Sequence, residues 1–375
     1  MEFFISGQEV SQKYYKSFQP NLINKNWILN NMEVIQLLSK ADRHIGRLDM
    51  YSEYVNIDLF IRMHIAKEAT QSSKIEGTQT NMEEAFLKKE EIAFEKRDDW
   101  EEVQNYISAM NEAVKLLHTL PFSSRLIKQT HKILLQGVRG EHKLPGEYRT
   151  SQNWIGGASI NDAVFIPPIH NTINELISDL EHFANDELNP LPDLVKIAII
   201  HYQFETIHPF LDGNGRVGRL LITLYLVSKG VLKQPILYLS DFFERNRTLY
   251  YDNLMRVRTH NDMNQWLKFF LTGVIETSKK GVATFDGILQ LQKVLEEKLK
   301  TLGNRNVDAR KIIDYLYSQP IIEVNKVEEL IEKSSVTSYK LLSDLEKLDI
   351  IKEISGAQRN RLYVFKDYID LFNNN

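Results

Sequence analysis

The sequence contains no cysteine, which excludes disulfide bonds, thiolate zinc sites and cysteine nucleophiles at once. Long apolar runs are absent as well, since no stretch approaches the roughly 18–20 residues that a transmembrane helix needs. The first residues, MEFFISGQE, show no basic segment followed by an apolar one, so a secretory signal is not expected. These absences predict a cytoplasmic protein without membrane contact.

The chain also lacks a strong excess of either charge. Its 46 Lys and Arg residues face 50 Asp and Glu residues, which gives a net charge of −4 at pH 7. Such a balance argues against bulk binding of a polyanion. With 375 residues, the chain is long enough for two or three domains, each with a core of its own.

One stretch, residues 208–219, organises the chain, and it reads HPFLDGNGRVGR. Residues 194–207 before it carry apolar side chains at the three-and-four spacing of a helix. Residues 220–227 after it are apolar on nearly every side, and Lys229-Gly230 is a typical end of a helix. The pattern predicts two buried helices joined by a short polar loop.

The residue types in this loop suit the binding of an anion. Gly213 and Gly215 let backbone N–H groups converge without obstruction by a Cβ. The second helix is expected to begin near Asn214, where free N–H groups and the helix dipole attract negative charge. Arg216 and Arg219 lie three residues apart, so both side chains can face the same anion.

Two further residues of the loop add reactive chemistry. Asp212 supplies a hard oxygen ligand that suits Mg²⁺ bridging phosphates. His208, at the end of the first helix, is placed to act as a general base. Taken singly, a histidine at a helix end is usually a cap and a Gly-Asn-Gly segment is usually a turn. Their joint arrangement favours nucleotide chemistry.

Residues 208–219 resemble the signature of the Fic family, HPF-x-[D/E]-GNGR-x-x-R, at every fixed position. The resemblance implies a helical core and the transfer of AMP from ATP to a Ser, Thr or Tyr hydroxyl of a protein. It makes His208 the catalytic base and Asp212 the ligand of Mg²⁺ between the α- and β-phosphates. The phosphate-binding residues that it implies are Gly213, Asn214, Gly215 and Gly218, with Arg216 on the β-phosphate and Arg219 on the γ-phosphate. Doc-type phosphotransferases replace the second glycine by lysine, so Gly215 argues against their reaction.

A second motif lies upstream, where a helical pattern over residues 32–74 ends near Gly77. In isolation Glu76 is typical of a solvated surface carboxylate. Beside the Fic-like stretch, Ser72, Glu76 and Gly77 resemble the family's inhibitory motif, [S/T]-x-x-x-E-[G/N]. A carboxylate paired with Arg219 would occupy the place of the ATP γ-phosphate, so ATP would bind out of line.

Two more segments are linked to the expected site. Residues 146–168 are rich in turn signals and contain one short apolar run before two prolines, which predicts an irregular β-hairpin. The resemblance makes this hairpin a flap on which an extended target segment adds as a strand. Asn246 and Tyr250 lie four apart on a predicted helix, and an amide and a ring at that spacing can contact adenine. A tyrosine on a helix is more often part of the core, but the resemblance implies adenine contacts at about this distance past the motif, which favours the adenine role for both.

The C-terminal part resembles a winged helix-turn-helix, with helices over 309–318, 326–333 and 336–348 and a hairpin over 350–365. The second helix of the helix-turn-helix begins with Ser335-Val336-Thr337-Ser338-Tyr339, polar groups of the kind that read a major groove. Residues 309–375 carry ten Lys and Arg against eleven Asp and Glu, and only the wing, with Lys352, Arg359 and Arg361, is basic. DNA affinity needs a basic surface, so a protein-binding or dimerising module is the competing interpretation.

The expected fold is mainly α: a Fic-type helical core with a β-hairpin flap, followed by a winged-helix-like domain. Residues 1–31 are expected to form loop with a short helix, and a helix is expected to restart after Thr80-Asn81. Three functions are weighed: a self-inhibited adenylyltransferase using ATP and Mg²⁺, removal of AMP from a modified target, and a DNA-binding regulator with a nucleotide-sensing core. No residue pattern identifies the target protein. Self-modification and a homodimer both agree with the resemblance. The predicted domains are 1–118 with the inhibitory motif, 119–275 with the flap 146–168, a linker helix 276–304, and 305–375.

Overall fold

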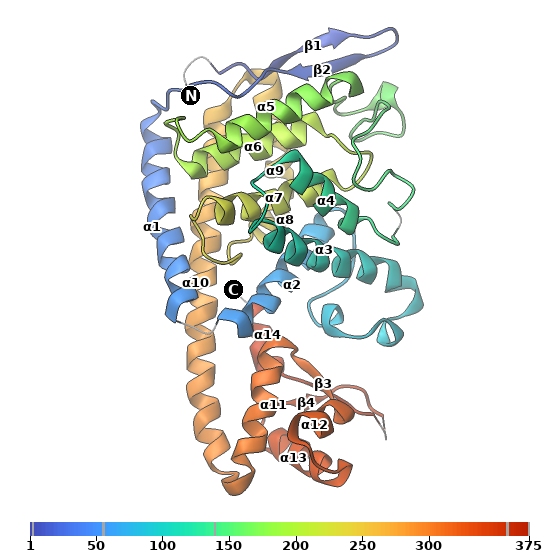
Figure 1. Ribbon diagram of the computed structural model, residues 1–375, viewed down its shortest axis with the longest axis vertical. Coiled ribbons are helices and arrows are strands. Elements are labelled where there is room, and N and C mark those ends of the chain that lie inside the picture. Colours follow the sequence, from blue (N-terminus) through green and yellow to red (C-terminus); the bar gives the residue numbers. More distant parts are fainter. Residues whose placement is uncertain (2–3, 55–56, 139, 358–359, 374–375) are drawn as a thin grey trace.

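A computed structural model describes residues 1, 4–54, 57–138, 140–357 and 360–373 (Figure 1). The helices of the N-terminal and central parts are α1 (Met32–Tyr54), α2 (Ile57–Ile75), α3 (Arg97–Leu116), α4 (Ser124–Leu134), α5 (Ile173–Asn185), α6 (Asp193–Ile207), α7 (Asn214–Ser228), α8 (Ser240–Arg245), α9 (Arg247–His260) and α10 (Met263–Lys300). The C-terminal helices are α11 (Asn306–Ser318), α12 (Val324–Ile331), α13 (Ser335–Lys347) and α14 (Lys366–Asn373). The strands are β1 (Gly7–Ser11), β2 (Lys16–Pro20), β3 (Ile321–Glu323), β4 (Lys352–Glu353) and β5 (Leu362–Val364). The expectation of a mainly helical fold is confirmed.

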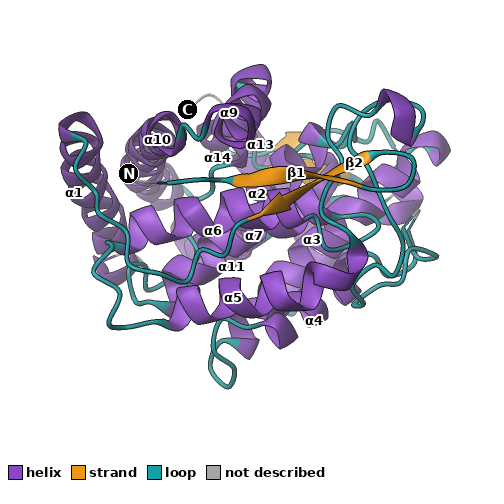
Figure 2. Cartoon of the chain, turned by 90° about the horizontal axis from the view of Figure 1, so that it is seen from above, coloured by secondary structure: helices purple, strands orange, loops and turns teal. Residues whose placement is uncertain are grey.

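Helices α6 and α7 form the centre of the fold, as predicted for two apolar segments on either side of a polar loop. Residues 194–207 of α6 are all buried, polar side chains such as Gln203 and Glu205 included, because the helix has neighbours on every side. Those neighbours include α5, α7 and α10, and Figure 2 shows these helices grouped around α6. Since α6 and α7 are packed along their lengths, the loop that joins them has a fixed position.

The predicted linker helix is part of a longer element. Helix α10 runs without a break over Met263–Lys300, so the expected boundary at residue 276 falls inside it. It lies beside α1 through its first half and reaches the C-terminal helices with its second half (Figure 1). The ring of Phe285 on α10 stacks on Tyr51 of α1 with centroids 5.2 Å apart. The amphipathic pattern thus covers a packed helix shared by both parts of the chain, not a separate linker.

The expectation of loop with a short helix for residues 1–31 is wrong. Strands β1 and β2 form an antiparallel hairpin in which Gly7 pairs with Pro20 and Ser11 with Lys16. Each strand has only five residues and little alternation, so its own pattern does not indicate a strand. Contacts distant in sequence stabilise the hairpin instead: the Phe18 N–H donates to the Ile166 carbonyl at 2.9 Å.

The helix expected to restart after Thr80 is also wrong in extent. Asn81 and Glu84 do form the reciprocal capping bonds, each side chain accepting from the other residue's N–H at 2.9 Å. Only short 3₁₀ turns follow, however, and the next α-helix begins at Arg97. The sequence also predicts helices over residues 99–117 and 123–135, and these are present as α3 and α4, whereas α5 is not among the predicted elements.

In the C-terminal part, the three expected helices are present as α11, α12 and α13, and the hairpin as β4 and β5. The short strand β3 and the helix α14 were not expected; β3 joins β5, which gives the sheet order β3-β5-β4. Gln358 and Arg359 of the expected wing lie outside the described residues. The role of this part in binding DNA or protein stays a prediction. Across the described ranges, no helix is both long and apolar enough to cross a membrane.

Candidate active site

The loop between α6 and α7 has a defined and closed geometry. His208 ends α6 in the left-handed region, with φ of 50°, and Gly213 precedes α7 with φ of 72°. Within the loop, the side-chain amide of Asn214 binds Phe210 twice, accepting from its N–H and donating to its carbonyl, both at 2.8 Å. Helix α7 begins at Asn214, as predicted, so its first N–H groups face the loop.

Arg216 is held at the start of α7 by two carboxylates. Its Nη1 donates to Glu102 Oε2 on α3 at 3.0 Å, and its Nη2 lies 3.6 Å from Asp212 Oδ1. The arginine side chain is buried, whereas the Asp212 side chain is 43% exposed. An exposed carboxylate beside a helix N-terminus fits the Mg²⁺ that the resemblance implies, because that ion takes one or two carboxylates and completes its shell with phosphate and water. Glu102 was not predicted.

The predicted inhibitory residues and the predicted γ-phosphate clamp lie together. Arg219 Nη2 donates to Glu76 Oε1 at 2.6 Å, and the same guanidinium donates to the Ser72 hydroxyl and carbonyl, both at 2.9 Å. A Cβ on Gly215 would lie 2.3 Å from Glu76 Oε1, so the carboxylate rests directly on the backbone of that glycine. Gly77 follows with φ of 104°, which ends α2.

The charge of this pair is fixed by its surroundings. Burial alone would raise the pKa of Glu76, but the charge and hydrogen bond of Arg219 outweigh it, so that pKa is lowered. Glu76 raises the pKa of Arg219 still further above its ordinary value, against the effect of burial. Both groups are therefore ionised near neutral pH, and the arginine is fully engaged by α2.

His208 is in the neutral form that a general base requires. Burial lowers its pKa to about 3, and the positive charges of Arg258 and Arg149 lower it as well. Its Nδ1 is buried and has no hydrogen-bond partner among the described residues. The backbone is nevertheless held on both sides, since the His208 N–H donates to Phe204 and its carbonyl accepts from Arg149 Nε at 3.0 Å.

His131 of α4 packs against the loop between α6 and α7, and this contact was not predicted. Its ring stacks on Phe210 with centroids 3.6 Å apart and an angle of 6° between the planes. Its Nδ1 accepts from the Gly146 N–H at 2.8 Å, so the proton lies on Nε2, which donates to the Asp212 carbonyl at 3.0 Å. Burial lowers the pKa of His131 to about 4, so the ring stays neutral. The sequence offers no local signal for this contact.

The predicted adenine residues lie at the start of α9. Asn246, with φ of −114°, separates α8 from α9, and the Tyr250 N–H donates to its carbonyl at 2.9 Å. Tyr250 is 1% exposed, and its hydroxyl forms a 2.9 Å hydrogen bond with His201 Nε2. Its ring stacks on Phe243 at 4.5 Å. Tyr250 is therefore packed in the core of this structure, and an adenine contact of either residue stays a prediction.

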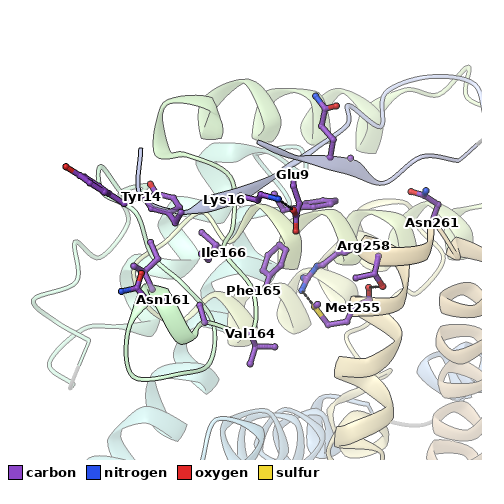
Figure 3. A pocket seen from close by; sticks show the side chains of 17 residues that line it. Glu9, Tyr14, Lys16, Asn161, Val164, Phe165, Ile166, Met255, Arg258 and Asn261 are labelled. Carbon is purple, nitrogen blue, oxygen red and sulfur yellow. Dashed lines mark hydrogen bonds and ion pairs between the residues drawn. The ribbon is translucent and has the colours of Figure 1, made fainter. Parts of the chain in front are cut away.

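The predicted flap is an irregular hairpin whose two sides meet in one antiparallel bridge, between Ile155 and Phe165. A cavity of about 650 Å³ opens between the flap, the β1–β2 hairpin and α9 (Figure 3). Figure 3 shows Phe165 and Arg258 facing each other in this cavity, and the guanidinium lies 3.8 Å from the ring centroid. Val164 on the flap lines the same cavity and is 65% exposed.

Glu205, one turn before His208, is a buried carboxyl that the sequence did not single out. Its side chain is 7% exposed, and Oε1 has no hydrogen-bond partner among the residues described. Burial raises its pKa to about 7, with a further increase from Glu76 that Arg219 and Arg258 oppose. Its Oε1 lies so close to Gly218 that a Cβ there would approach it to 2.2 Å, which explains the glycine at that position.

This shift predicts a pH-dependent stability. The carboxyl ionises near pH 4.5 in the unfolded chain but near pH 7 in the folded one, so the folded state holds one more proton between those values. Its contribution to stability is complete below about pH 4.5 and is lost as pH rises through 7, about 3 kcal/mol in all. Relative to the parent protein, Glu205→Gln should gain stability by this amount between pH 5 and pH 8 in urea unfolding. The same substitution at exposed Glu90 is the control, and equal pH dependence of both variants would contradict the assignment.

Comparisons with known proteins agree with this arrangement. Residues 35–115, which include Ser72 and Glu76, match the Fic/DOC family N-terminal domain, and residues 121–226, which include the loop motif, match the Fic/DOC family domain. A probable protein adenylyltransferase of Aquifex aeolicus is 29% identical over 189 residues, covering 45% of this chain and 56% of the relative. The protein adenylyltransferase Fic of Drosophila mojavensis is 26% identical over 281 residues, covering 69% of this chain and 51% of the relative. The chain thus spans about half the length of these two relatives.

Solved structures show the same fold. A Fic family protein from Desulfovibrio desulfuricans G20 superposes with a TM-score of 0.59 at 19% identity, covering 91% of this chain and 98% of that one. A Fic domain containing signaling protein from Bacteroides thetaiotaomicron superposes with a TM-score of 0.51 at 19% identity, covering 67% and 95%. Two adjoining family domains, the complete loop motif and the shared fold together place this chain in the Fic/DOC family.

Proposed function

We propose that this protein is an adenylyltransferase that moves AMP from ATP to a hydroxyl group of a target protein. One observation supports this most directly: the Glu76 carboxylate lies on Gly215 and pairs with Arg219, inside an anion site at the start of α7. A site that accepts a carboxylate in this way can accept a phosphate, because both present oxygens to the same donors. The names of the relatives supply the reaction class.

The proposed reaction needs a base, a metal ligand and a phosphate site, and residues 208–219 are assigned to all three. His208 takes the proton of the hydroxyl, whose oxygen then attacks the α-phosphorus of ATP. The bond from the α-phosphorus to the bridging oxygen breaks, and pyrophosphate leaves while AMP remains on the target oxygen. Mg²⁺ held by Asp212 would neutralise charge on the α- and β-phosphates. The phosphates themselves are assigned to the N–H groups and side chains of Gly213, Asn214, Gly215, Arg216, Gly218 and Arg219.

Self-inhibition belongs to the same proposal. The Glu76–Arg219 ion pair engages the arginine that the γ-phosphate needs, and the carboxylate itself fills the space over Gly215. ATP can then bind in line only after α2 releases Glu76, since two anions cannot share one clamp. Ser72 strengthens the inhibited state because it accepts two further bonds from the same guanidinium.

The target is proposed to dock on the flap as an extended segment. Residues 163–166 of the flap line the cavity together with residues of the β1–β2 hairpin, and an extended target segment is proposed to add there as a strand. The β1–β2 hairpin forms the other wall, so the docked segment would lie between two hairpins (Figure 3). A homodimer stays a prediction of the family resemblance.

The test is incubation of purified protein with ATP labelled at the α-phosphate, with Mg²⁺, in the Glu76→Gly form and in the parent form. Label on a protein band supports adenylyl transfer; label at the γ-phosphate gives the control for phosphoryl transfer. If neither form transfers label while both bind ATP, the proposal is wrong. Release of free AMP from a pre-labelled target would instead favour AMP removal. Salt-dependent, sequence-selective duplex binding that is lost on truncation after Leu302 would favour the DNA-binding regulator.

A further inference from the structure

The last backbone carbonyls of a helix have no hydrogen-bond partner within it, so those at the end of α6 need donors from elsewhere in the chain. Arg149, at the base of the flap, satisfies three successive carbonyls there. Its Nε donates to the His208 carbonyl at 3.0 Å and its Nη2 to the Ile207 carbonyl at 3.4 Å. Its backbone N–H donates to the Pro209 carbonyl at 2.9 Å. One residue, Arg149, thus donates hydrogen bonds to three carbonyls of the turn that carries His208.

The same guanidinium also holds both sides of the flap. Its Nη1 donates to the Ser151 carbonyl at 3.0 Å on the entering side, and its Nη2 to the Pro168 carbonyl at 2.6 Å on the returning side. Asn153 adds a parallel tie, because its Nδ2 donates to the carbonyls of His208 at 3.3 Å and Phe210 at 3.0 Å. Flap and catalytic turn are therefore fixed to each other through side chains from the flap.

Every acceptor of the Arg149 guanidinium given above is a backbone carbonyl, so its positive charge is not cancelled by a carboxylate. The residue is 2% exposed, and burial lowers its pKa to about 10, which leaves it charged at neutral pH. The charged groups that act on His208 are Arg149, Arg258 and Glu76. Arg258 binds the same turn from α9, since it donates to Thr206 Oγ1 and to the Glu205 carbonyl, both at 3.2 Å.

We propose that Arg149 is a positioning residue for AMP transfer, which fixes the flap and the His208 turn as one unit so that a target docked on the flap meets the base in register. The inference rests on the proposed function. The flap sets the position of a docked strand. Because Arg149 fixes the flap to the His208 turn, it also sets the distance between the target hydroxyl and the imidazole. Its charge has a second effect, because a cation beside His208 opposes protonation of the ring.

Two substitutions in the Glu76→Gly background separate geometry from charge. Arg149→Lys keeps the charge but loses the planar fork that bonds four carbonyls. Its kcat for transfer should fall on the order of 100-fold, with little change in KM for ATP, because the ATP contacts lie in residues 213–219. Because the positive charge is kept, the transfer rate of Arg149→Lys should fall at the same acid pH as that of the parent. Arg149→Met also removes the charge, so its acid limb should move upward by about one pH unit.

The outcomes distinguish this proposal from its alternatives. A kcat of parental size in Arg149→Lys, or an unshifted acid limb in a folded Arg149→Met, would overturn it, since a merely structural role lowers the active fraction without moving the pH profile. If Arg149→Met does not fold, the kcat and KM of Arg149→Lys decide. Arg125→Met, an exposed arginine on the neighbouring α4, is the matched control and should match the parent. Lack of transfer by Glu76→Gly itself would contradict the proposed function instead.

Discussion

The Glu76→Gly variant is expected to transfer AMP on the order of 10- to 100-fold faster than the parent protein. The substitution removes the carboxylate that lies 2.6 Å from Arg219 Nη2 and against Gly215. The guanidinium then keeps its two bonds to Ser72 but becomes available to the γ-phosphate. The rate is measured as label incorporated from ATP labelled at the α-phosphate, at equal protein concentration.

In the proposed function, Glu76 and the γ-phosphate of ATP compete for Arg219, so nucleotide affinity gives a second test. ATP should bind the Glu76→Gly variant more tightly than the parent, whereas ADP, which lacks the γ-phosphate, should bind both about equally. Calorimetric titration with each nucleotide measures the difference. Glu187→Gly is the matched control, because Glu187 is an exposed glutamate in a turn distant in sequence from the motif. Equal gains for ATP and ADP would mean that Glu76 acts on something other than the γ-phosphate position.

Replacing His208 with Ala in the Glu76→Gly background should lower transfer by about two to four orders of magnitude. The change removes the group that takes the proton, while the anion site at the start of α7 remains, so ATP binding should persist. Neutral imidazole is the active form, and the pKa of about 3 keeps it so over the whole physiological range. We therefore expect that protonation of His208 causes no change in the parent rate between pH 6 and pH 8.

The control for this loss is His118→Ala, at an exposed histidine that follows α3. It should transfer AMP at the parental rate. Nucleotide binding and far-ultraviolet circular dichroism of His208→Ala should equal those of the parent, since only the imidazole is removed. Transfer that persists at more than about a tenth of the parental rate would show that another group is the base.

The local parts of the site could be predicted because their residues are neighbours in the chain. His208, Asp212 and Arg219 fall within one loop and the first two turns of a helix, so spacing alone brings them together. The helices on either side follow from apolar periodicity, which is a local property. Ser72 and Glu76 could be identified only through resemblance to a known motif, and the structure places both on Arg219.

The contacts that could not be predicted join segments distant in sequence. Strand β2 is stabilised by its bond to Ile166 rather than by its own pattern. The C-terminal part holds the helix that carries Glu76: Phe60 packs on Tyr317 at 5.2 Å, and Lys67 bonds to the Phe372 carbonyl at 2.5 Å. No spacing rule connects such positions, because their neighbours are set by how the helices pack.

The sequence by itself determined the proposed chemistry, because the groups assigned to phosphate binding and proton transfer lie in one short stretch whose helical setting is local. Only the tertiary structure decided which contacts hold these groups. The state of Arg219 depends on α2, the setting of His208 on Arg149 of the flap, and the burial of Tyr250 on the packing of α6 against α9. Each of these is a contact across the fold, whose energy comes from burial and hydrogen bonds that exist only after the chain has packed.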